Sequence, residues 1–169
     1  PLLYFATFKG KTGNGVMVTG SHNPKNYNGF KIVLDRSSLK EKEILLLKKR
    51  IEDGNFLTGK GELSNQSFDQ TYIDKMNEKI ILRKKLKVVL DCGNGAGSVL
   101  GPTIFKKFSD ELIELFCEVD GSFPNHHPDP SDPKNLSDLI KAVKLHKADI
   151  GIALDLSLIH ISEPTRPLY

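Results

Sequence analysis

Residues 19–24 read Thr-Gly-Ser-His-Asn-Pro and place a hydroxyl group beside an imidazole. Ser21 supplies the hydroxyl, His22 the imidazole, and Lys31 adds an ammonium group ten positions after the serine. A serine beside a base can act as a nucleophile, and reactive side chains are commonly carried on loops held by rigid elements. A serine turn closed by Pro24 is the simpler interpretation of the same residues. Taken alone, this short segment leaves both interpretations open.

Apolar runs on both sides must position this loop. Residues 15–18 read as a buried strand, and residues 30–34 alternate in the manner of a second strand. Helices are expected at residues 1–9, 40–53 and 68–80. The apolar side chains Ile44, Leu47 and Ile51 share one face of the middle helix. The serine loop is therefore predicted to join two strands.

The pattern changes near residues 83–85, where we expect a domain boundary. From there the chain alternates between strands and helices, which is typical of a doubly wound α/β unit. Strands are expected near residues 87–91, 112–119 and 148–155, with helices near 99–108 and after Asp132-Pro133. Between them, residues 120–133 contain four prolines and are expected to form an irregular loop.

The serine loop, with Asn28-Gly29-Phe30-Lys31 after it, resembles the active-site serine loop of the α-D-phosphohexomutases, the phosphomannomutase/phosphoglucomutase family. Residues 89–95 resemble the strand that opens the second domain of this family. Residues 117–130 resemble a loop of that domain in bacterial phosphomannomutases, and residues 149–155 resemble the strand leading into the metal loop.

This resemblance covers residues 1–155 and implies an α/β fold in two parts. Residues 1–83 would be the C-terminal part of domain I, a mixed-sheet α/β phosphohexomutase domain that carries the serine loop. Residues 84–155 would be the N-terminal part of a doubly wound α/β domain II. The family has four domains, so the resemblance implies a fragment that is itself inactive.

The resemblance also implies a reaction. Ser21 would donate a phosphoryl group to a hexose monophosphate and recover the other phosphate of a hexose bisphosphate intermediate. Phosphate would thereby move between the C1 and C6 oxygens of mannose or glucose. Such a transfer needs charge neutralisation and alignment more than covalent assistance.

Four more residues receive roles through the same resemblance. Lys31 would be a catalytic cation near the transferring phosphoryl group. His22 and Asn23 would hydrogen-bond the phosphate or orient the loop, and a purely structural role for His22 stays open. Gly20 would let the backbone approach the phosphate closely.

Asp155 ends the last predicted strand, at the edge where α/β sheets place their ligands. In the family this residue begins Asp-Gly-Asp-Gly-Asp-Arg, whose carboxylates hold Mg²⁺ together with the phosphoserine, here the phosphate on Ser21. Here Leu156 follows instead of glycine, so two of the three carboxylates and the arginine are absent. The metal role of Asp155 therefore rests on the resemblance.

Residues 156–169 resemble the conceptual translation of a transposon-end adapter used to prepare sequencing libraries. We interpret them as a non-native tail and give them no role in the fold or the chemistry.

Composition excludes several classes of protein. The chain has 169 residues, a net charge of +3 and 38% hydrophobic residues, and all three values are ordinary for a globular protein. Its basic clusters are not interleaved with aromatic residues, so nucleic acid is not an expected partner. No uninterrupted apolar stretch reaches the length of a membrane span, so a membrane is not expected either. The two cysteines, Cys92 and Cys117, are expected to be buried free thiols of a reducing compartment, with the cytoplasm as the default.

Two alternatives involve a different function. Residues 93–97 could form a dinucleotide-binding turn, although the glycine spacing departs from the usual pattern. The chain could also be a non-catalytic sugar-phosphate-binding protein. A zinc site at His126 and His127 is a third idea, but these histidines lack ligand spacing and are better interpreted as loop packing.

Overall fold

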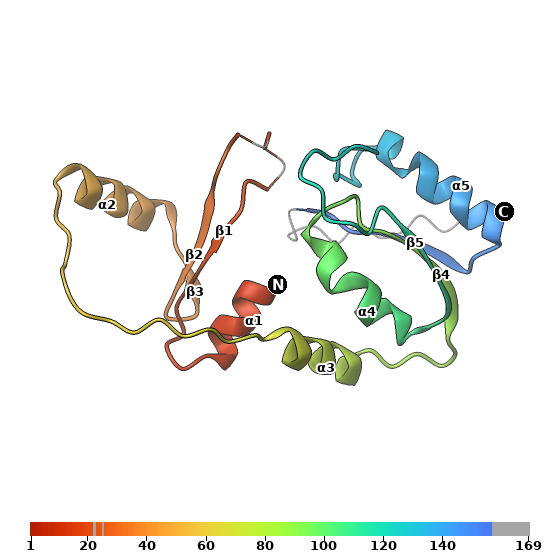
Figure 1. The fold of residues 1–169 in the computed structure, drawn as a ribbon, viewed down its shortest axis with the longest axis horizontal. Helices are drawn as coiled ribbons and strands as arrows, with labels where there is room; N and C mark the ends of the chain where they lie inside the picture. Colours follow the sequence, from red (N-terminus) through yellow and green to blue (C-terminus); the bar gives the residue numbers. More distant parts are fainter. Residues whose placement is uncertain (22, 25, 157–169) are drawn as a thin grey trace. The chain divides into compact units, whose positions relative to one another are not determined.

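The computed structural model describes residues 1–156 apart from residues 22 and 25 (Figure 1). The described chain divides into two compact units. The first comprises residues 1–19 and 29–68, and the second comprises residues 20–28 and those from 69 onward. The proposed non-native tail lies outside the described residues except for Leu156.

The first unit contains an antiparallel sheet in the order β1-β2-β3. Strand β1 (Gly15–Val18) pairs with β2 (Phe30–Leu34), as the apolar runs predict, with Val18 opposite Phe30. Strand β3 (Ser37–Ser38) follows a tight turn in which Asp35 and Arg36 both have positive φ. Helix α1 (Leu2–Lys9) packs against β1, and Val33 of β2 is the most deeply buried apolar side chain here.

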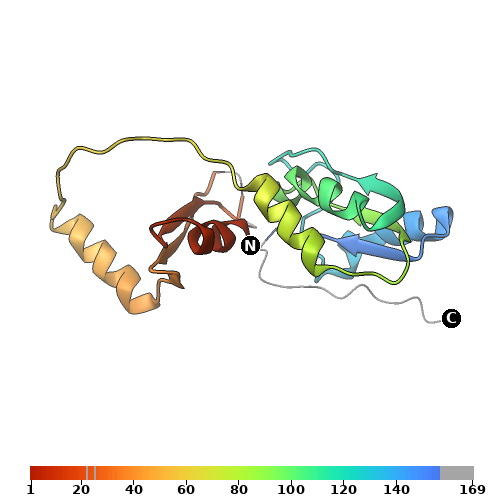
Figure 2. The ribbon, with the colours of Figure 1, turned by 90° about the horizontal axis from the view of Figure 1, so that it is seen from below.

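Helix α2 (Glu41–Glu52) begins and ends where predicted, but its apolar face is not buried. Glu43 closes its first turn by accepting the N–H of Lys40 at 2.7 Å, and Lys49 and Arg50 lie in the last turn, where positive charge is favourable. Ile44 and Ile51 of the predicted stripe are 53% and 64% exposed. From α2 to the next helix, residues 55–68 form neither helix nor strand (Figure 2).

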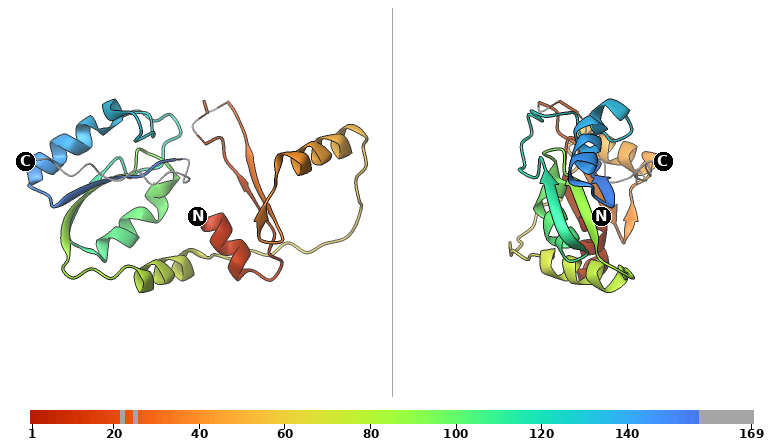
Figure 3. Two further views of the ribbon diagram at one scale, coloured as in Figure 1. Left: turned by 180° about the vertical axis from the view of Figure 1, so that it is seen from behind. Right: turned by 90° about the vertical axis from the view of Figure 1, so that its right-hand side faces the viewer.

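The second unit is a three-layer α/β/α structure, which confirms the predicted α/β class (Figures 1 and 3). Its parallel sheet has the order β5-β4-β6, with β4 (Leu86–Asp91) between β5 (Ser109–Leu115) and β6 (Ile150–Ala153). The chain first winds to one side of β4 and then crosses to the other, which is the doubly wound arrangement.

Helices cover both faces of this sheet. Helices α3 (Asp69–Lys79) and α4 (Gly101–Lys106) share one cluster of apolar side chains, formed by Ile73, Ile104 and Phe108. Helix α5 (Ser137–His146) buries Leu139 and Ala142 against Val89 on the opposite face. Because both faces are covered, the middle of β4 is the apolar run Val88-Val89-Leu90, in which Val89 and Leu90 are fully buried.

Three predicted boundaries in this unit are wrong. The strand expected at residues 148–155 is shorter, at Ile150–Ala153, and Asp155 lies beyond its end. The strand expected at residues 112–119 lies at 109–115, because Phe116 adopts a positive φ of 52° and turns the chain out of the sheet. The helix expected at residues 99–108 is split into the 3₁₀ turn η1 (Ala96–Val99) and α4. Pro102 lacks an N–H and disfavours helical backbone before it, so the helix restarts there.

The irregular loop and the helix after it are confirmed. Asp132 accepts the N–H of Lys134 at 2.9 Å and caps η2 (Pro133–Leu136), which leads into α5. No helix in the described part of the chain is long and apolar enough to span a membrane.

Replacing Leu139 by alanine is expected to lower the free energy of unfolding by about 2–4 kcal/mol, because it opens a cavity between α5 and β4. Leu145→Ala in the same helix is the matched control. Its side chain is 78% exposed, so the change should stay within about 0.5 kcal/mol. Urea unfolding of both variants measures the difference, and equal losses would show that α5 does not pack as described.

Candidate functional site

The serine loop is held at its base by backbone hydrogen bonds. The N–H of Thr19 donates to the carbonyl oxygen of Gly29 at 2.9 Å, directly beyond the last pair of β1 and β2. Inside the loop, the N–H of Asn23 donates to the carbonyl of Gly20 at 3.0 Å. The strands therefore fix both ends of the loop, as expected from the flanking apolar runs.

Glycine is required at the narrow part of this loop. A Cβ atom on Gly29 would lie 2.6 Å from the carbonyl oxygen of Thr19, and one on Gly20 would lie 3.0 Å from that of Tyr27. The distance at Gly29 is too short for any side chain, and the distance at Gly20 would force its neighbour to shift, so the two glycines let the sides of the loop approach each other. The approach to a phosphate that was expected of Gly20 stays a prediction.

Ser21 lies at the tip of the tight turn and has a strained backbone. Its φ is 50°, in the left-handed region that costs non-glycine residues about 1–2 kcal/mol. Strain of this kind is concentrated at functional sites, where the surrounding structure maintains it. Ser21 is half-buried and Asn23 is exposed, while His22 lies outside the described residues.

Lys31 lies in β2, opposite Met17 of β1 and two residues after the bond that closes the serine loop. The structure thus attaches Ser21 and Lys31 to one pair of strands.

A second cluster of polar groups lies at the carboxyl ends of β4 and β6. Asp91 ends β4 and Asp155 follows β6, and the N–H of Leu154 donates to the carbonyl oxygen of Asp91 at 2.8 Å. Because the chain changes winding direction at β4, a crevice is expected between these strand ends. Asp155 was expected to end the strand and lies two residues beyond it, at the carboxyl edge where α/β sheets commonly place their ligands.

Asp91 is the principal site residue that the sequence analysis missed. Its side chain is 1% exposed and contacts His126, whose Nε2 lies 3.0 Å and 3.2 Å from the two carboxyl oxygens. The N–H of Gly93 donates to Asp91 Oδ1 at 2.9 Å. The sequence did signal an acidic residue at the end of a buried parallel strand. It gave no sign of its partner, because His126 is 35 positions away from Asp91.

The hydrogen bonds of His126 place a proton between it and Asp91. Nδ1 lies 2.9 Å from the carbonyl oxygen of His127, which only accepts, so Nδ1 must donate. Nε2 faces a carboxyl group, and one proton must lie between the two. The pair is either an imidazolium with a carboxylate or a neutral imidazole with a carboxylic acid. Burial raises the pKa of Asp91, and Gly93 and His126 offset only part of that rise.

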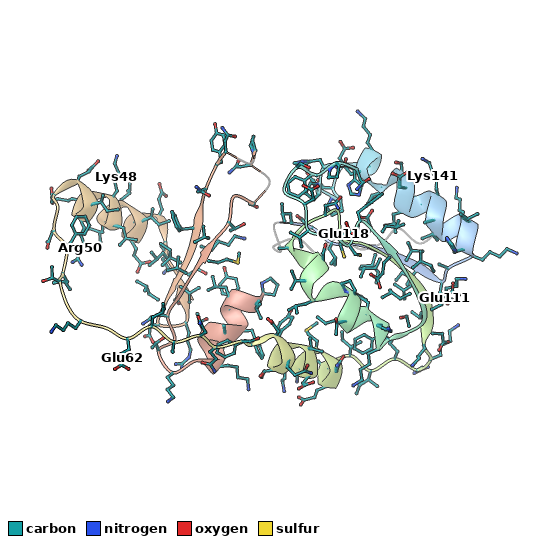
Figure 4. The ribbon with its side chains drawn as sticks, in the orientation of Figure 1. Lys48, Arg50, Glu62, Glu111, Glu118 and Lys141 are labelled. Atoms are coloured by element: carbon teal, nitrogen blue, oxygen red, sulfur yellow. The ribbon has the colours of Figure 1, made fainter. Side chains whose placement is uncertain are left out.

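Asn94 organises the loop around this pair. Its N–H donates to the carbonyl of Phe116 at 2.8 Å, and its side-chain amide donates to the carbonyl of Glu118 at 2.9 Å. Asn125 donates back to the Asn94 side-chain oxygen at 2.8 Å. Figure 4 labels Glu118 where the chain leaves β5. Loop packing, the interpretation preferred for His126, is what the structure shows for it.

With this geometry established, comparison with known proteins gives the class. The family model described as phosphoglucomutase/phosphomannomutase, alpha/beta/alpha domain I, matches residues 1–57. The model for alpha/beta/alpha domain II of the same proteins matches residues 70–156. The chain therefore belongs to the phosphoglucomutase/phosphomannomutase family, and the resemblance is confirmed.

Individual relatives agree with this assignment. A phosphomannomutase/phosphoglucomutase of Pseudomonas syringae pv. tomato is 48% identical over 157 residues, covering 92% of this chain and 33% of the relative. A phosphoglucomutase of Neisseria meningitidis is 43% identical, with 92% and 34% covered. The crystal structure of a family protein from Burkholderia thailandensis has a TM-score of 0.80 at 44% identity, covering 85% of this chain and 31% of that one. The chain spans about a third of the length of these relatives.

Membership of this family implies a divalent metal cofactor, and the described residues do not form a site for one. Among residues 1–21, 23, 24 and 26–156, no three His, Cys, Asp or Glu side chains gather closely enough to hold a metal ion. Asp155 alone cannot bind a divalent ion firmly, because oxygen ligands of such ions come in sets.

Replacing His126 by phenylalanine is expected to lower the free energy of unfolding by about 3 kcal/mol at neutral pH, because the Asp91 carboxyl group stays buried without the imidazole that shares a proton with it. Loss of His126 raises the pKa of Asp91 further. A raised pKa in the folded state favours folding below the pKa of the unfolded chain, and that advantage disappears as pH rises. The loss should therefore shrink as pH falls and be smallest below about pH 4, where Asp91 is protonated in both the folded and the unfolded chain.

Urea unfolding at a series of pH values measures this dependence. His127→Phe is the control, because the side chain next along the chain is exposed. A loss of stability that does not change with pH would contradict the buried pair, as would equal losses in the two variants.

Proposed function

We propose that the full-length protein to which this chain corresponds interconverts hexose 1-phosphates and hexose 6-phosphates, with mannose and glucose as the sugars. The observation that carries this proposal is the serine loop. Ser21 lies in a strained turn whose ends are fixed by β1 and β2, within a chain that belongs to the phosphoglucomutase/phosphomannomutase family.

In the proposed reaction, phosphorylated Ser21 meets a hexose monophosphate. A sugar hydroxyl oxygen bonds to phosphorus as the bond from phosphorus to Ser21 Oγ breaks, and the hydroxyl proton leaves. The resulting hexose bisphosphate then returns its other phosphoryl group to Ser21 Oγ. The serine is regenerated in its phosphorylated form, and the phosphate on the sugar has changed position.

The chain's own residues would contribute alignment and charge. Lys31 follows the loop on β2 and would balance the charge of the transferring phosphoryl group. The positive φ of Ser21 and the close approach at Gly20 would hold the phosphoserine in one orientation. His22 and Asn23 would hydrogen-bond the phosphate or orient the loop.

We propose Mg²⁺ as the metal of the full-length protein, with Asp155 and the phosphate on Ser21 among its ligands. Hard oxygen ligands and a phosphate are the partners that Mg²⁺ prefers. The ligand set is incomplete in this chain, so no step above passes through the metal. Free thiols suit a reducing compartment, and we propose the cytoplasm.

The domain boundary is also part of the proposal. Residues 1–83 were expected in domain I and residues 84–155 in domain II. Helix α3 shares an apolar cluster with α4, which supports placing the boundary earlier, in the extended segment before Asp69.

Packing accounts for a glycine of the turn considered as a dinucleotide site. A Cβ atom on Gly97 would lie 2.7 Å from Leu154 Cδ1, so this residue is small because the strand end packs against it. The geometry therefore favours the mutase over the cofactor-binding alternative.

The 169-residue chain itself is expected to show no mutase turnover. It spans about a third of its relatives, and the described residues lack a metal site. A coupled assay that follows formation of glucose 6-phosphate from glucose 1-phosphate, with added Mg²⁺ and hexose bisphosphate, measures this. Turnover by the purified chain would show that the remaining domains are dispensable.

Ser21→Ala in the full-length protein is expected to reduce mutase turnover at least about a thousandfold, because the phosphoryl carrier is lost. Ser37→Ala is the matched control, since Ser37 is an exposed serine of β3, and should leave the rate unchanged. The same coupled assay measures both. Near-normal turnover in Ser21→Ala would show that another group carries the phosphoryl.

A further inference from the structure

Two sulfur atoms lie side by side at the carboxyl edge of the second unit's sheet. Cys92 Sγ and Cys117 Sγ are 3.1 Å apart, and both residues are free thiols. These are the only cysteines of the chain. Neither sulfur takes part in the proposed phosphoryl transfer.

Neighbouring parallel strands hold the two cysteines in place. Cys92 follows β4, and its N–H donates to the carbonyl oxygen of Leu115 at 3.0 Å, in the last residue of β5. Cys117 comes two residues later, after the turn at Phe116. Because the backbone fixes both positions, the sulfurs need to approach by only about 1 Å to reach the length of a disulfide bond.

We propose that Cys92 and Cys117 form a redox modification site that closes reversibly to an intramolecular disulfide when the protein meets a peroxide. The site lies between the turn after β4 and the loop after β5, next to the Asp91–His126 pair. This inference does not depend on the proposed mutase activity.

The balanced reaction has two steps. Cys117, which is half-buried while Cys92 is 1% exposed, is the sulfur that the peroxide reaches first. Its sulfur bonds to a peroxide oxygen as the O–O bond breaks, giving a sulfenic acid and one water. The Cys92 sulfur then attacks the Cys117 sulfur; the S–O bond breaks, and the hydroxyl leaves with the Cys92 proton as a second water. The two thiols lose two electrons, and hydrogen peroxide is reduced to two waters.

The electrostatics agree with this order. Burial raises the pKa of both thiols. Cys117 is the less buried of the two, so its thiolate keeps more contact with solvent and forms more readily than that of Cys92. The carboxylates of Glu114 and Asp91 raise the pKa of Cys117, which makes oxidation slow at neutral pH and faster in mild alkali.

Oxidation of the purified chain with hydrogen peroxide at about pH 8 tests the proposal. The titratable thiols should fall from two to none, the intact mass should fall by two hydrogens, and no disulfide between molecules should form. Peptide mapping should find Cys92 joined to Cys117, and dithiothreitol should restore both thiols. The oxidised protein should melt roughly 5 °C or more above the reduced protein, because the bond restricts the unfolded chain.

Single-cysteine variants distinguish a coupled pair of cysteines from two thiols that oxidise independently. Cys92→Ser leaves the accessible sulfur without a partner and should gain oxygen atoms, whereas Cys117→Ser should react more slowly. Peptide mapping of the wild-type chain tests whether Cys92 and Cys117 are joined, even if a variant fails to fold. Oxygen added to Cys117 without a cross-link, or disulfides formed only between molecules, would overturn the proposal.

Discussion

The Asp91 carboxyl group is buried at the end of the central strand of a parallel sheet, and it requires hydrogen-bond donors there. A buried carboxylate without partners would strongly destabilise the fold. Gly93 supplies one donor from the turn after β4, and His126, in the loop after β5, shares a proton with the carboxyl group. Satisfying this one group therefore fixes two irregular segments at the edge where α/β sheets place their ligands. Burial on both faces of β4 provides the stability on which this arrangement depends.

The serine loop is also held in a fixed conformation, but by a different interaction. Its described residues bury no charged side chain; its ends are joined by the hydrogen bond from Thr19 to Gly29, and its sides approach at glycine positions. The strain at Ser21 is tolerated because both ends of the turn are held. In both places an irregular segment leaves a strand, and backbone hydrogen bonds restrict its freedom. A preorganised loop of this kind is what phosphoryl transfer requires of a protein.

The sequence predicted the elements whose signals are local. Alternation and apolar runs located β1, β2 and β4, and the Asp132-Pro133 cap located the start of the helical segment at η2. Strand β3 was missed because two serines carry no apolar pattern, and it exists only through pairing with β2. The end of β5 was misplaced because an apolar run continues past the positive φ of Phe116.

The residues of the candidate site also divide into those with a local sequence signal and those without one. Ser21, Lys31 and Asp155 could be named from motifs, and their roles stay predictions. The Asp91–His126 pair could not be predicted, because it joins residues that only the doubly wound topology brings together. The Cys92–Cys117 contact depends likewise on the register of neighbouring strands. The apolar stripe correctly predicted helix α2. It could not establish whether the stripe is buried, and no residue of α2 is buried.

The central claim is that Ser21 carries the phosphoryl group. Phosphopeptide mapping of the full-length protein, after incubation with hexose bisphosphate, tests this claim most directly. The account predicts one phosphoryl group, located on the peptide that contains Ser21 and removed when hexose monophosphate and Mg²⁺ are added. A phosphoryl group on any other residue, or none on this peptide under conditions of active turnover, would contradict it.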